Sequence, residues 1–474
     1  MPSPAAGSTA LRTFCRLLAA VSLRAELGVL EELLVIASVF AHSKRMAPFF
    51  DANGNPSMEF TFEWRPLGKL HRRGTGANRN RARGYASIIW LQGNVRYGWN
   101  TLRILGIESS CDETAAAVVA DGREILSSVV ASQIDIHQKY GGVVPELASR
   151  EHLRQIVPVV REALAQAGMK LTDVDAIGVT QGPGLVGALL VGITYGKTLA
   201  QALGKPLVPV NHLEGHVHAV FLEAHKAGRT AKLPAVCLIV SGGHTVLYEV
   251  TPADPHVQDA GARLRYRKIG QTRDDAAGEA YDKVAKLLGL GYPGGPILDR
   301  LAAVSNGAPA PVKFGPTKMK GNLLDFSFSG LKTAVLYHVR EHPEYAAEIA
   351  TREAALQRGE RKFEQLLPLC SPKTLALVRE FQNAVVRDLV ERTMRAAEDL
   401  SVESVLVSGG VAANSQLRAT FEERSKSSGI EVFFPSRALS TDNAAMIAAA
   451  AYSRFRNGIL ADVTLNADPS LTLA

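Results

Sequence analysis

The sequence predicts an α/β fold from residue 102 onward. Short apolar, β-branched runs alternate with longer runs of helical period, and several of these runs end in glycine-rich turns. Two segments also share one design, because residues 238–243 read LIVSGG and residues 406–410 read LVSGG. A buried strand that ends at two glycines lets ligand oxygens reach backbone N–H groups that no Cβ shields. The repeated turn indicates an internal duplication built to hold phosphate, with two ordinary tight turns as the alternative.

The residues after each turn extend this prediction. After the second turn, VAANSQLRATFEER has a helical pattern and could present a helix N-terminus to a nucleotide. After the first turn, HTVLYEV alternates and predicts a strand-turn-strand element. Residues 103–106 and 114–119 predict the same element again, with hydroxyls and carboxylates in the turn at 108–113.

The remaining elements follow in chain order. Pro145–Gln166 and residues 187–203 predict helices, and residues 176–179 predict a buried strand between them. Residues 340–375 are highly charged with a helical period, which predicts a helical insertion on the surface.

Composition and charge limit the function. The chain has 474 residues, 46% of them hydrophobic, which suffices for two or three globular domains. Its four cysteines, Cys15, Cys111, Cys237 and Cys370, form no CxxC pair, which favours a reducing compartment. Residues 1–100 hold 13 basic and 6 acidic side chains and so account for the whole net charge of +7. Because the rest of the chain is neutral, any RNA contact must use a local basic patch or a partner subunit.

Residues 1–101 form an extension that differs from the rest. Residues 68–84 are rich in Gly, Arg and Asn without an apolar period, which predicts disorder. Residues 11–41 could form a helix, but charged residues leave no uncharged run long enough to span a bilayer. We expect a translation start assigned too far upstream and a cytoplasmic protein. The alternative is a mitochondrial or plastid transit peptide, which the absence of acids before Glu26 permits.

The motif NHLEGH predicts a metal site. It places His212 and His216 four residues apart, on one face of a helix. It is not the HExxH of zinc proteases, because a helix would rotate Glu214 off the ligand face. Asp442, in STDNAAM before an Ala-rich run, is a candidate third ligand. Two histidines and one carboxylate leave open coordination positions, as catalytic Zn²⁺ or Fe²⁺ sites require. The alternative is two non-ligand histidines, with Asp442 as a first-turn helix acid behind a Thr or Ser cap.

Residues 274–288 (DDAAGEAYDKVAKLL) predict an amphipathic helix with Asp275, Gly278 and Asp282 on one face. A carboxylate on such a glycine-flattened face suits sugar hydroxyls, and a solvated acidic face is the alternative. The YPGGP turn at 292–296 adds another glycine-rich backbone surface directly after the helix.

Together these motifs resemble one family, the tRNA N6-adenosine threonylcarbamoyltransferases, once called O-sialoglycoprotein endopeptidases. The motifs that carry the resemblance, in unbroken order, are ILGIESSCDET, YGGVVPELASREH, GPGLVGALLVG, NHLEGH, VSGGHT, DDAAGEAYDK, YPGGP, FSFSGLKTA, SGGVAAN and STDNAAM. The resemblance implies an actin-like, Hsp70-like, sugar-kinase fold, in which two duplicated RNase H-like lobes enclose a nucleotide cleft. The lobes are expected at 102–234 and 235–436, with 437–474 returning as a helix to the first lobe.

The resemblance also implies a site. One divalent ion, Fe²⁺ or else Zn²⁺, is expected on His212, His216 and Asp442. Asp112 and Glu113 match acidic residues of the family's active-site loop and are the catalytic candidates. The residues expected to bind threonylcarbamoyl-adenylate are Ile239, Val240, Ser241, Gly242, Gly243, Asp282, Gly295 and Asn414.

The implied reaction moves the threonylcarbamoyl group from threonylcarbamoyl-AMP to N6 of adenosine 37, in tRNAs that read codons beginning with A, and releases AMP. Because the donor is a mixed anhydride, it is already activated. Positioning the weakly nucleophilic amine and polarising the carbonyl are then the main tasks. The partners implied are tRNA, threonylcarbamoyl-AMP, a degenerate paralogue and a small P-loop ATPase, and no membrane.

Three other functions fit parts of the sequence. A metalloprotease would need a general base beside the metal, where Glu214 is misplaced. A sugar or acetate-type kinase would use the Ser-Gly-Gly turns for ATP, as would a chaperone-like ATPase, but both would leave His212 and His216 unused.

Overall fold

The computed structural model describes residues 101–473, except for 255, 257–260, 306 and 308, together with two short strands nearer the N-terminus. These two strands, β1 (Phe49–Phe50) and β2 (Pro56–Ser57), pair antiparallel. The chain divides into two units, Met1–Gly98 and Trp99–Ala474. The predicted helix at 11–41 and the predicted disorder at 68–84 lie outside the described residues.

The larger unit contains two five-stranded sheets built on one plan. The first has the order β5-β4-β3-β6-β7 and the second has the order β10-β9-β8-β11-β12. In each sheet the first three strands along the chain are antiparallel, and the last two run parallel to the first of them. The strands are β3 (Arg103–Glu108), β4 (Glu113–Ala120), β5 (Glu124–Ser132), β6 (Ala176–Gly182), β7 (Leu207–Asn211), β8 (Ala235–Val240), β9 (Thr245–Pro252), β10 (Leu264–Gln271), β11 (Ser404–Ser408) and β12 (Glu431–Phe433). The repeated plan confirms the predicted α/β fold and its internal duplication.

The duplication does not relate the two Ser-Gly-Gly turns to each other, and that part of the prediction is wrong. β8 and β11 are neighbours in the second sheet, with Ile239 paired to Ser408. The topological counterpart of the first turn is the acidic turn between β3 and β4, and that of the second is the Gly-Pro-Gly turn after β6. The two Ser-Gly-Gly turns lie side by side because adjacent parallel strands end at the same sheet edge.

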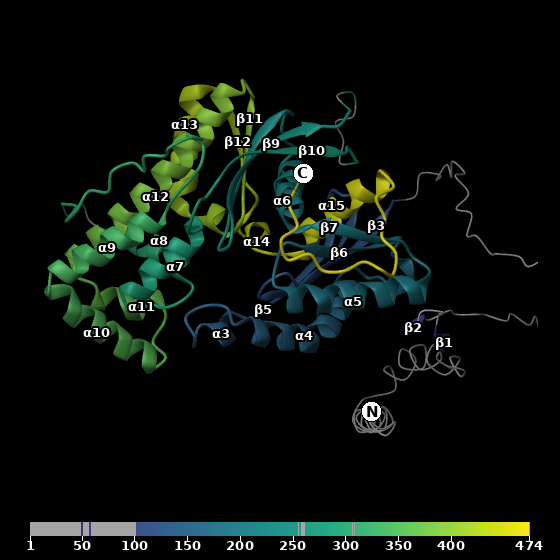
Figure 1. Ribbon diagram of the computed structural model, residues 1–474, viewed down its shortest axis with the longest axis horizontal. Coiled ribbons are helices and arrows are strands. Elements are labelled where there is room, and N and C mark those ends of the chain that lie inside the picture. The colour runs from purple at the N-terminus through teal and green to yellow at the C-terminus, as the bar shows by residue number, and fades with distance from the viewer. Residues whose placement is uncertain are drawn as a thin grey trace, which may run out of the picture. The chain divides into compact units, whose positions relative to one another are not determined.

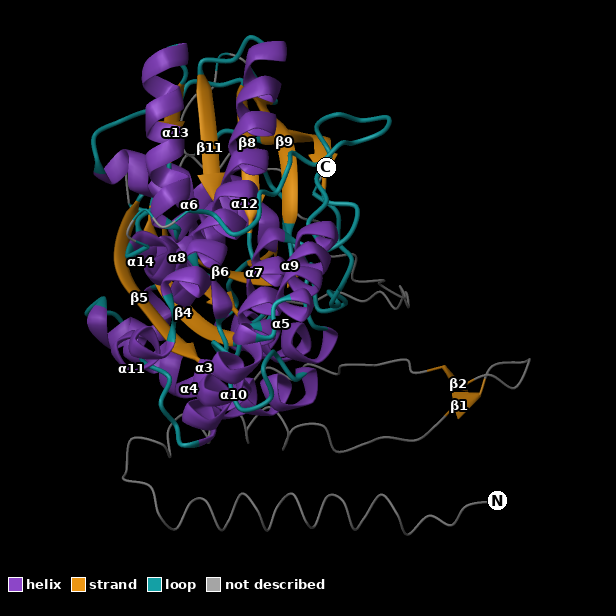
Figure 2. Ribbon diagram, turned by 90° about the vertical axis from the view of Figure 1, so that its left-hand side faces the viewer, coloured by secondary structure: helices purple, strands orange, loops and turns teal. Residues whose placement is uncertain are grey.

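Helices cover both faces of each sheet. α4 (Pro145–Gln166) and α5 (Val186–Leu203) lie side by side on one face of the first sheet (Figure 1). α6 (His212–Lys226) packs with α15 (Ala444–Arg456) and contributes side chains to the apolar clusters of both sheets. Figure 2 shows one sheet above α6 and the other below it. We propose lobe limits of 102–234 and 235–436, with 437–474 returning to the first lobe, because α15 packs on β3, β4 and β6.

Small residues let α15 approach its neighbours closely. Gly106 on β3 and Gly178 on β6 are paired, and a Cβ at Gly106 would lie 2.4 Å from the backbone oxygen of Ala444. On α6, a Cβ at Gly215 would lie 2.9 Å from the Ile447 side chain of α15. This packing brings the start of α15 to the start of α6, which is where the predicted metal ligands lie.

The other helices cover the outer face of the second sheet and the sheet edges. They are α3 (Ile134–His137), α7 (Ala277–Leu287), α8 (Gly294–Ala303), α9 (Ser329–Glu341), α10 (Glu344–Gln357), α11 (Phe363–Leu366), α12 (Pro372–Asp399), α13 (Ser415–Ser428) and α14 (Arg437–Ser440), with 3-10 turns at Leu171–Asp173, Leu367–Leu369 and Gly410–Ala413. The predicted insertion at 340–375 is helical, but it is more than a surface addition. Tyr345, Arg352 and Leu366 are buried, and Tyr345 and Leu366 belong to the second lobe's apolar cluster.

Among the described helices, α5 alone is long and apolar enough to cross a membrane, judged by length and composition. Its residues Leu189 and Ile193 pack in the apolar cluster of the first sheet, together with α4. A core helix of an α/β lobe meets the same criteria, so the described residues contain no clear membrane span.

Candidate functional site

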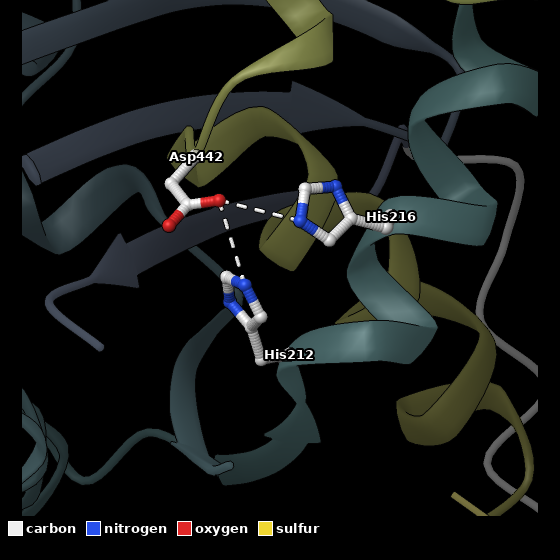
Figure 3. A group of neighbouring side chains, drawn as sticks. All are labelled: His212, His216 and Asp442. Atoms are coloured by element: carbon white, nitrogen blue, oxygen red, sulfur yellow. Dashed lines mark ion pairs between the residues drawn. The ribbon is translucent and has the colours of Figure 1, made fainter. Parts of the chain in front are cut away.

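The structure brings His212, His216 and Asp442 together between the two lobes. His212 opens α6 behind its N-cap Asn211, and His216 follows one turn later. Oδ1 of Asp442 lies 3.5 Å from Nε2 of His212 and 3.3 Å from Nε2 of His216. Figure 3 shows both rings turned toward this one carboxylate oxygen. The three side chains offer ligand atoms that lie within 4.8 Å of one another.

Asp442 is not an ordinary helix acid. The N-cap of α15 is Asn443, whose Oδ1 accepts the Met446 N–H at 3.0 Å. Asp442 thus precedes the cap, outside the first turn, and its carboxylate is free to point at the histidines. The alternative that placed Asp442 behind a Thr or Ser cap is therefore wrong.

The donor set fits a divalent metal ion. His216 is fully buried; its Nε2 faces Asp442 at 3.3 Å, while its Nδ1 has no hydrogen-bond partner among the described residues. A buried polar atom without a partner is unfavourable by about 1–3 kcal/mol, so such an atom implies a bound ligand or strain. Two imidazoles and one carboxylate suit iron or zinc and leave coordination positions open.

A second carboxylate orients the His212 ring. Glu108, at the end of β3, is fully buried, and its Oε2 lies 3.0 Å from Nδ1 of His212. Thr180 donates its hydroxyl to the same oxygen at 2.8 Å. A carboxylate on the far ring nitrogen leaves Nε2 of His212 facing Asp442, as a metal ligand requires. The sequence prediction did not include Glu108, because its place two residues before a Ser-Cys pair matches no known spacing of metal-site residues.

The charges in this cluster shift the pKa values strongly. Burial opposes ionisation of Asp442, but the imidazoles of His212 and His216 outweigh it and hold the pKa of Asp442 well below its usual range. Burial also opposes protonation of His212, but Asp442 and Glu108 outweigh it and raise the pKa of His212 well above its usual value. A metal ion must therefore displace a proton from this site, so its affinity falls as pH falls.

Glu214 takes no part in the metal cluster. Its Oε2 lies 2.9 Å from Nη1 of Arg454 on α15, in a buried ion pair. The expectation that Glu214 would be rotated off the ligand face is confirmed. A protease-type general base is therefore missing from the position where it would be needed.

The acidic turn after β3 carries Asp112 and Glu113 beside the metal ligands. Burial, followed by the charges of Asp112 and Asp442, raises the pKa of Glu113 well above its usual value. The same causes, in the same order, raise the pKa of the Cys111 thiol. Cys111 therefore stays protonated, which excludes it as a thiolate nucleophile at neutral pH.

His152, from α4, holds this turn in place. Its Nδ1 lies 2.8 Å from the Thr114 hydroxyl and its Nε2 lies 3.0 Å from the Cys111 carbonyl oxygen. Burial lowers the pKa of His152, so the ring is neutral: Nε2–H donates to the carbonyl, and Nδ1 accepts from the hydroxyl. One ring thereby fixes both ends of the segment that carries Asp112 and Glu113. The sequence prediction did not include His152, because it stands in an amphipathic helix as an ordinary buried residue.

We expect His152→Gln to lower kcat by about tenfold and leave metal content unchanged, because a slightly misplaced catalytic group loses rate without losing binding. Kinetics and metal analysis on the purified variant would measure this. His225→Gln is the matched control, since His225 is exposed on the last turn of α6. An unchanged kcat would contradict the positioning role.

The glycine-rich turns have open space beside their backbone. A Cβ placed at Gly242, Gly243, Gly295 or Gly410 would meet no atom within 4 Å. Gly409, by contrast, has φ +97° and a Cβ there would lie 2.3 Å from the Val240 carbonyl oxygen, so the second turn is pressed against the first. Open backbone at four glycines suits a ligand that hydrogen-bonds to N–H groups.

The first turn also borders the metal site. The burial of His244, followed by the charges of His212 and His216, lowers the pKa of His244 to about 4. Ser241 in this turn accepts the Gly278 N–H at 3.2 Å, which anchors the turn to α7. Ile239 and Val240 are fully buried, so only their backbone could contact a ligand.

Asp282 and Asn414 reach the cleft in different ways. Oδ1 of Asp282 accepts the Gly294 N–H at 2.6 Å, and burial raises the pKa of Asp282 to about 6. The Asn414 side chain is buried as the N-cap of α13, where it accepts the Leu417 N–H at 2.9 Å. Asp275 lies before α7 rather than on the predicted face, and it pairs with Lys283 at 2.7 Å.

The prediction that the second turn presents a helix N-terminus to a nucleotide is wrong. The 3-10 turn Gly410–Ala413 separates the turn from α13. Asp299 accepts the Ser415 N–H at 3.0 Å and the Ser415 hydroxyl at 2.8 Å. Protein side chains already accept hydrogen bonds from N–H groups in the first turn of α13. The exposed backbone of the glycines therefore remains available to a ligand.

Two five-stranded sheets of one plan, with glycine-rich turns and a cluster of two histidines and one aspartate, define a duplicated α/β protein with a candidate metal site. Residues 124–449 match the model of one family, described as tRNA N6-adenosine threonylcarbamoyltransferase. The chain belongs to this family.

Two relatives bearing the same name show how far the match extends. The protein of Koribacter versatilis is 55% identical over 385 residues, which cover 78% of this chain and 98% of the relative. That of Anaeromyxobacter sp. strain Fw109-5 is 51% identical over 373 residues, covering 78% and 100%. Among solved structures, HypF of T. kodakarensis is a distant likeness, with 13% identity and a TM-score of 0.44 over 77% of this chain and 49% of that one.

Proposed function

We propose that this protein transfers the threonylcarbamoyl group from threonylcarbamoyl-AMP to N6 of adenosine 37, in tRNAs that read codons beginning with A, and releases AMP. The observation that carries the proposal is the cluster of His212, His216 and Asp442 near the open glycine turn at Gly242 and Gly243, in a chain of this family. A kinase or a chaperone-like ATPase would have no need for this cluster.

We propose that the adenylate donor lies along Ser241, Gly242, Gly243 and Gly295. Exposed backbone N–H groups there suit its phosphate and carbonyl oxygens. Ile239, Val240 and Asn414 would act through backbone atoms or by shaping the cleft floor, since their side chains are buried. Asp282 would act chiefly by holding the turn that contains Gly295, through its bond to Gly294.

The metal we propose is Fe²⁺, with Zn²⁺ as the alternative, held by His212, His216 and Asp442. A bound divalent ion would supply Lewis-acid polarisation of a substrate carbonyl or phosphate oxygen. The chain's own residues do the rest. Glu108 keeps His212 in the ligand orientation, and His152 holds the acidic turn against the reacting centre.

The acceptor amine must lose a proton as the new C–N bond forms and AMP leaves. We propose Asp112 as the group that accepts it, with Glu113 beside it, whose pKa is raised by burial and by the charges of Asp112 and Asp442. Burial of Asp112 keeps bulk water away from the carbonyl, which protects the mixed anhydride from hydrolysis.

We expect Asp112→Asn to lower kcat by about 10² to 10⁴, the range for loss of a general base, with metal content and donor binding unchanged. Single-turnover measurement of AMP release in the presence of tRNA would show this. Asp135→Asn is the control, because Asp135 is exposed on α3. If Asp112→Asn turned over at the wild-type rate, the assignment would be abandoned.

We also propose a degenerate paralogue and a small P-loop ATPase as partners, and a cytoplasmic location. The docking face we propose is on α4 and α5, where Leu153 and Val186 are 66% and 54% exposed and Leu190 is 40% exposed. Apolar side chains grouped in this way favour a partner contact. Mass spectrometry of proteins that co-purify from the cytoplasmic fraction would detect both subunits, and their absence would argue against this assembly.

Reconstitution tests the proposed activity directly. The holoprotein, together with the subunits that co-purify with it, threonylcarbamoyl-AMP and unmodified tRNA, should release AMP and form N6-threonylcarbamoyladenosine in equal amounts. Metal analysis of the same anaerobic preparation should give about one iron per chain. AMP release without modified tRNA would indicate only hydrolysis, and that result would overturn the proposal.

A further inference from the structure

An open groove of about 430 Å³ lies between the two lobes, on the side of α3. The first lobe contributes Ile134 and Gln138 of α3, and the second contributes the turn before α8 and the segment that leads into α11. The groove residues used below are Tyr292, Arg300, Arg361, Lys362, Phe363 and Glu364. None of them is assigned to the donor, the metal or the acidic turn.

The groove is basic, although residues 101–474 taken together carry no net charge. Arg300 forms an ion pair with Glu364 at 2.7 Å and lies 3.9 Å above the Phe363 ring centroid. Arg361 and Lys362 add two further cations to the lining, and no ion pair involves either of them among the described residues. Nη1 of Arg361 donates to the Leu356 carbonyl oxygen at 2.5 Å, which leaves its other N–H groups for a ligand. The local charge is therefore positive, which provides a local basic patch, one of the two routes to RNA contact that the neutral composition leaves, the other being a partner subunit.

One wall of the groove continues into the turn that contains Gly295. Tyr292 lines the groove and stands two residues before Gly294, whose N–H donates to Asp282 at 2.6 Å. Burial first, and then the charges of Asp112 and Asp282, raise the pKa of Tyr292. The phenol therefore stays neutral and gives the groove a flat aromatic surface.

We propose that this groove binds the single-stranded nucleotides that flank the acceptor adenosine in the tRNA loop. Arg361 and Lys362 contact backbone phosphates, and Tyr292 stacks on a base beside the acidic turn. Basic side chains that track a backbone, next to an aromatic ring, are the combination that binds unpaired RNA. The inference rests on the proposed function, because that function requires an adenosine from a tRNA loop at Asp112. It also gives the helical insertion at 340–375 a role, since it supplies both cations.

The test is tRNA binding by the full-length holoprotein across a range of KCl concentrations, for wild type and for Arg361→Gln with Lys362→Gln. Each phosphate contact to a single strand contributes about 0.7 to the slope of log Kd against log salt, so the double variant should lose about 1.4. At low salt its Kd should rise about tenfold or more. In steady state, KM for tRNA should rise while kcat, metal content and binding of threonylcarbamoyl-AMP stay unchanged.

The matched control is Arg358→Gln with Lys373→Gln, which removes two exposed cations from the same insertion but outside the groove. Thermal unfolding of both double variants checks that the insertion remains folded. A salt slope and a KM for tRNA equal to those of wild type would overturn the groove proposal while leaving the transferase intact. Loss of tRNA affinity in a protein that forms no modified adenosine would instead support the groove and contradict the proposed function.

Discussion

His216→Ala is expected to remove the bound metal and to lower the transfer rate by about 10³-fold or more. His216 is fully buried, its Nε2 lies 3.3 Å from Oδ1 of Asp442, and its Nδ1 has no hydrogen-bond partner among the described residues. Removing it leaves two ligands, which cannot hold a divalent ion tightly. The several kcal/mol of charge stabilisation that a metal supplies would be lost with it.

The measurement is metal content by elemental analysis, together with single-turnover transfer to tRNA. His225→Ala serves as the control, because His225 lies on the same helix but is exposed. The unfolding temperature shows whether the variant is folded. Because alanine favours helix formation, α6 should remain helical in the variant. A His216→Ala protein that keeps both its metal and its rate would contradict the assignment of the site.

Arg352→Met is expected to lower the free energy of unfolding by about 2–4 kcal/mol, the largest stability effect we predict outside the site. Arg352 is fully buried and donates to the Leu288 carbonyl at the end of α7 and to the Leu369 carbonyl, each at 2.8 Å. Its Nη1 also lies 2.9 Å from Glu348. Methionine fills a similar volume but leaves two carbonyls and one carboxylate without this donor.

Urea unfolding, with two-state analysis of the cooperative transition, measures this effect. Arg358→Met is the control, because Arg358 is exposed and pairs only with the nearby Glu360, so its effect should stay below about 1 kcal/mol. Equal midpoints for the two variants would show that the insertion is not part of the second lobe's core.

The fold could be predicted from the sequence wherever a local pattern decides the structure. The helix at Pro145–Gln166 has the predicted bounds, because its apolar period and its proline in the first turn mark it locally. The two histidines were predicted as one ligand pair because their spacing is a property of a single helix. Asp442 was predicted as their partner only as a candidate, since its proximity depends on α15 packing against α6 through Gly215.

What the sequence could not show depends on contacts between distant elements. The two Ser-Gly-Gly turns read as copies, but β8 and β11 are neighbours in one sheet, and strand order is not visible in a local pattern. Arg352 reads as a surface charge because its neighbours are charged, yet it fills the space between α10 and α7. Glu108 and His152 could not be predicted for the same reason. The residues that they contact lie far away in the chain.

The most direct test of the central claim is nucleoside mass analysis of total tRNA from cells depleted of this protein. Depletion should remove N6-threonylcarbamoyladenosine, a plasmid with the wild-type chain should restore it, and a plasmid with His216→Ala should not. Restoration by His216→Ala would contradict the metal site. An unchanged level of the modified nucleoside after depletion, with no second enzyme of this family in the cell, would contradict the transferase function itself.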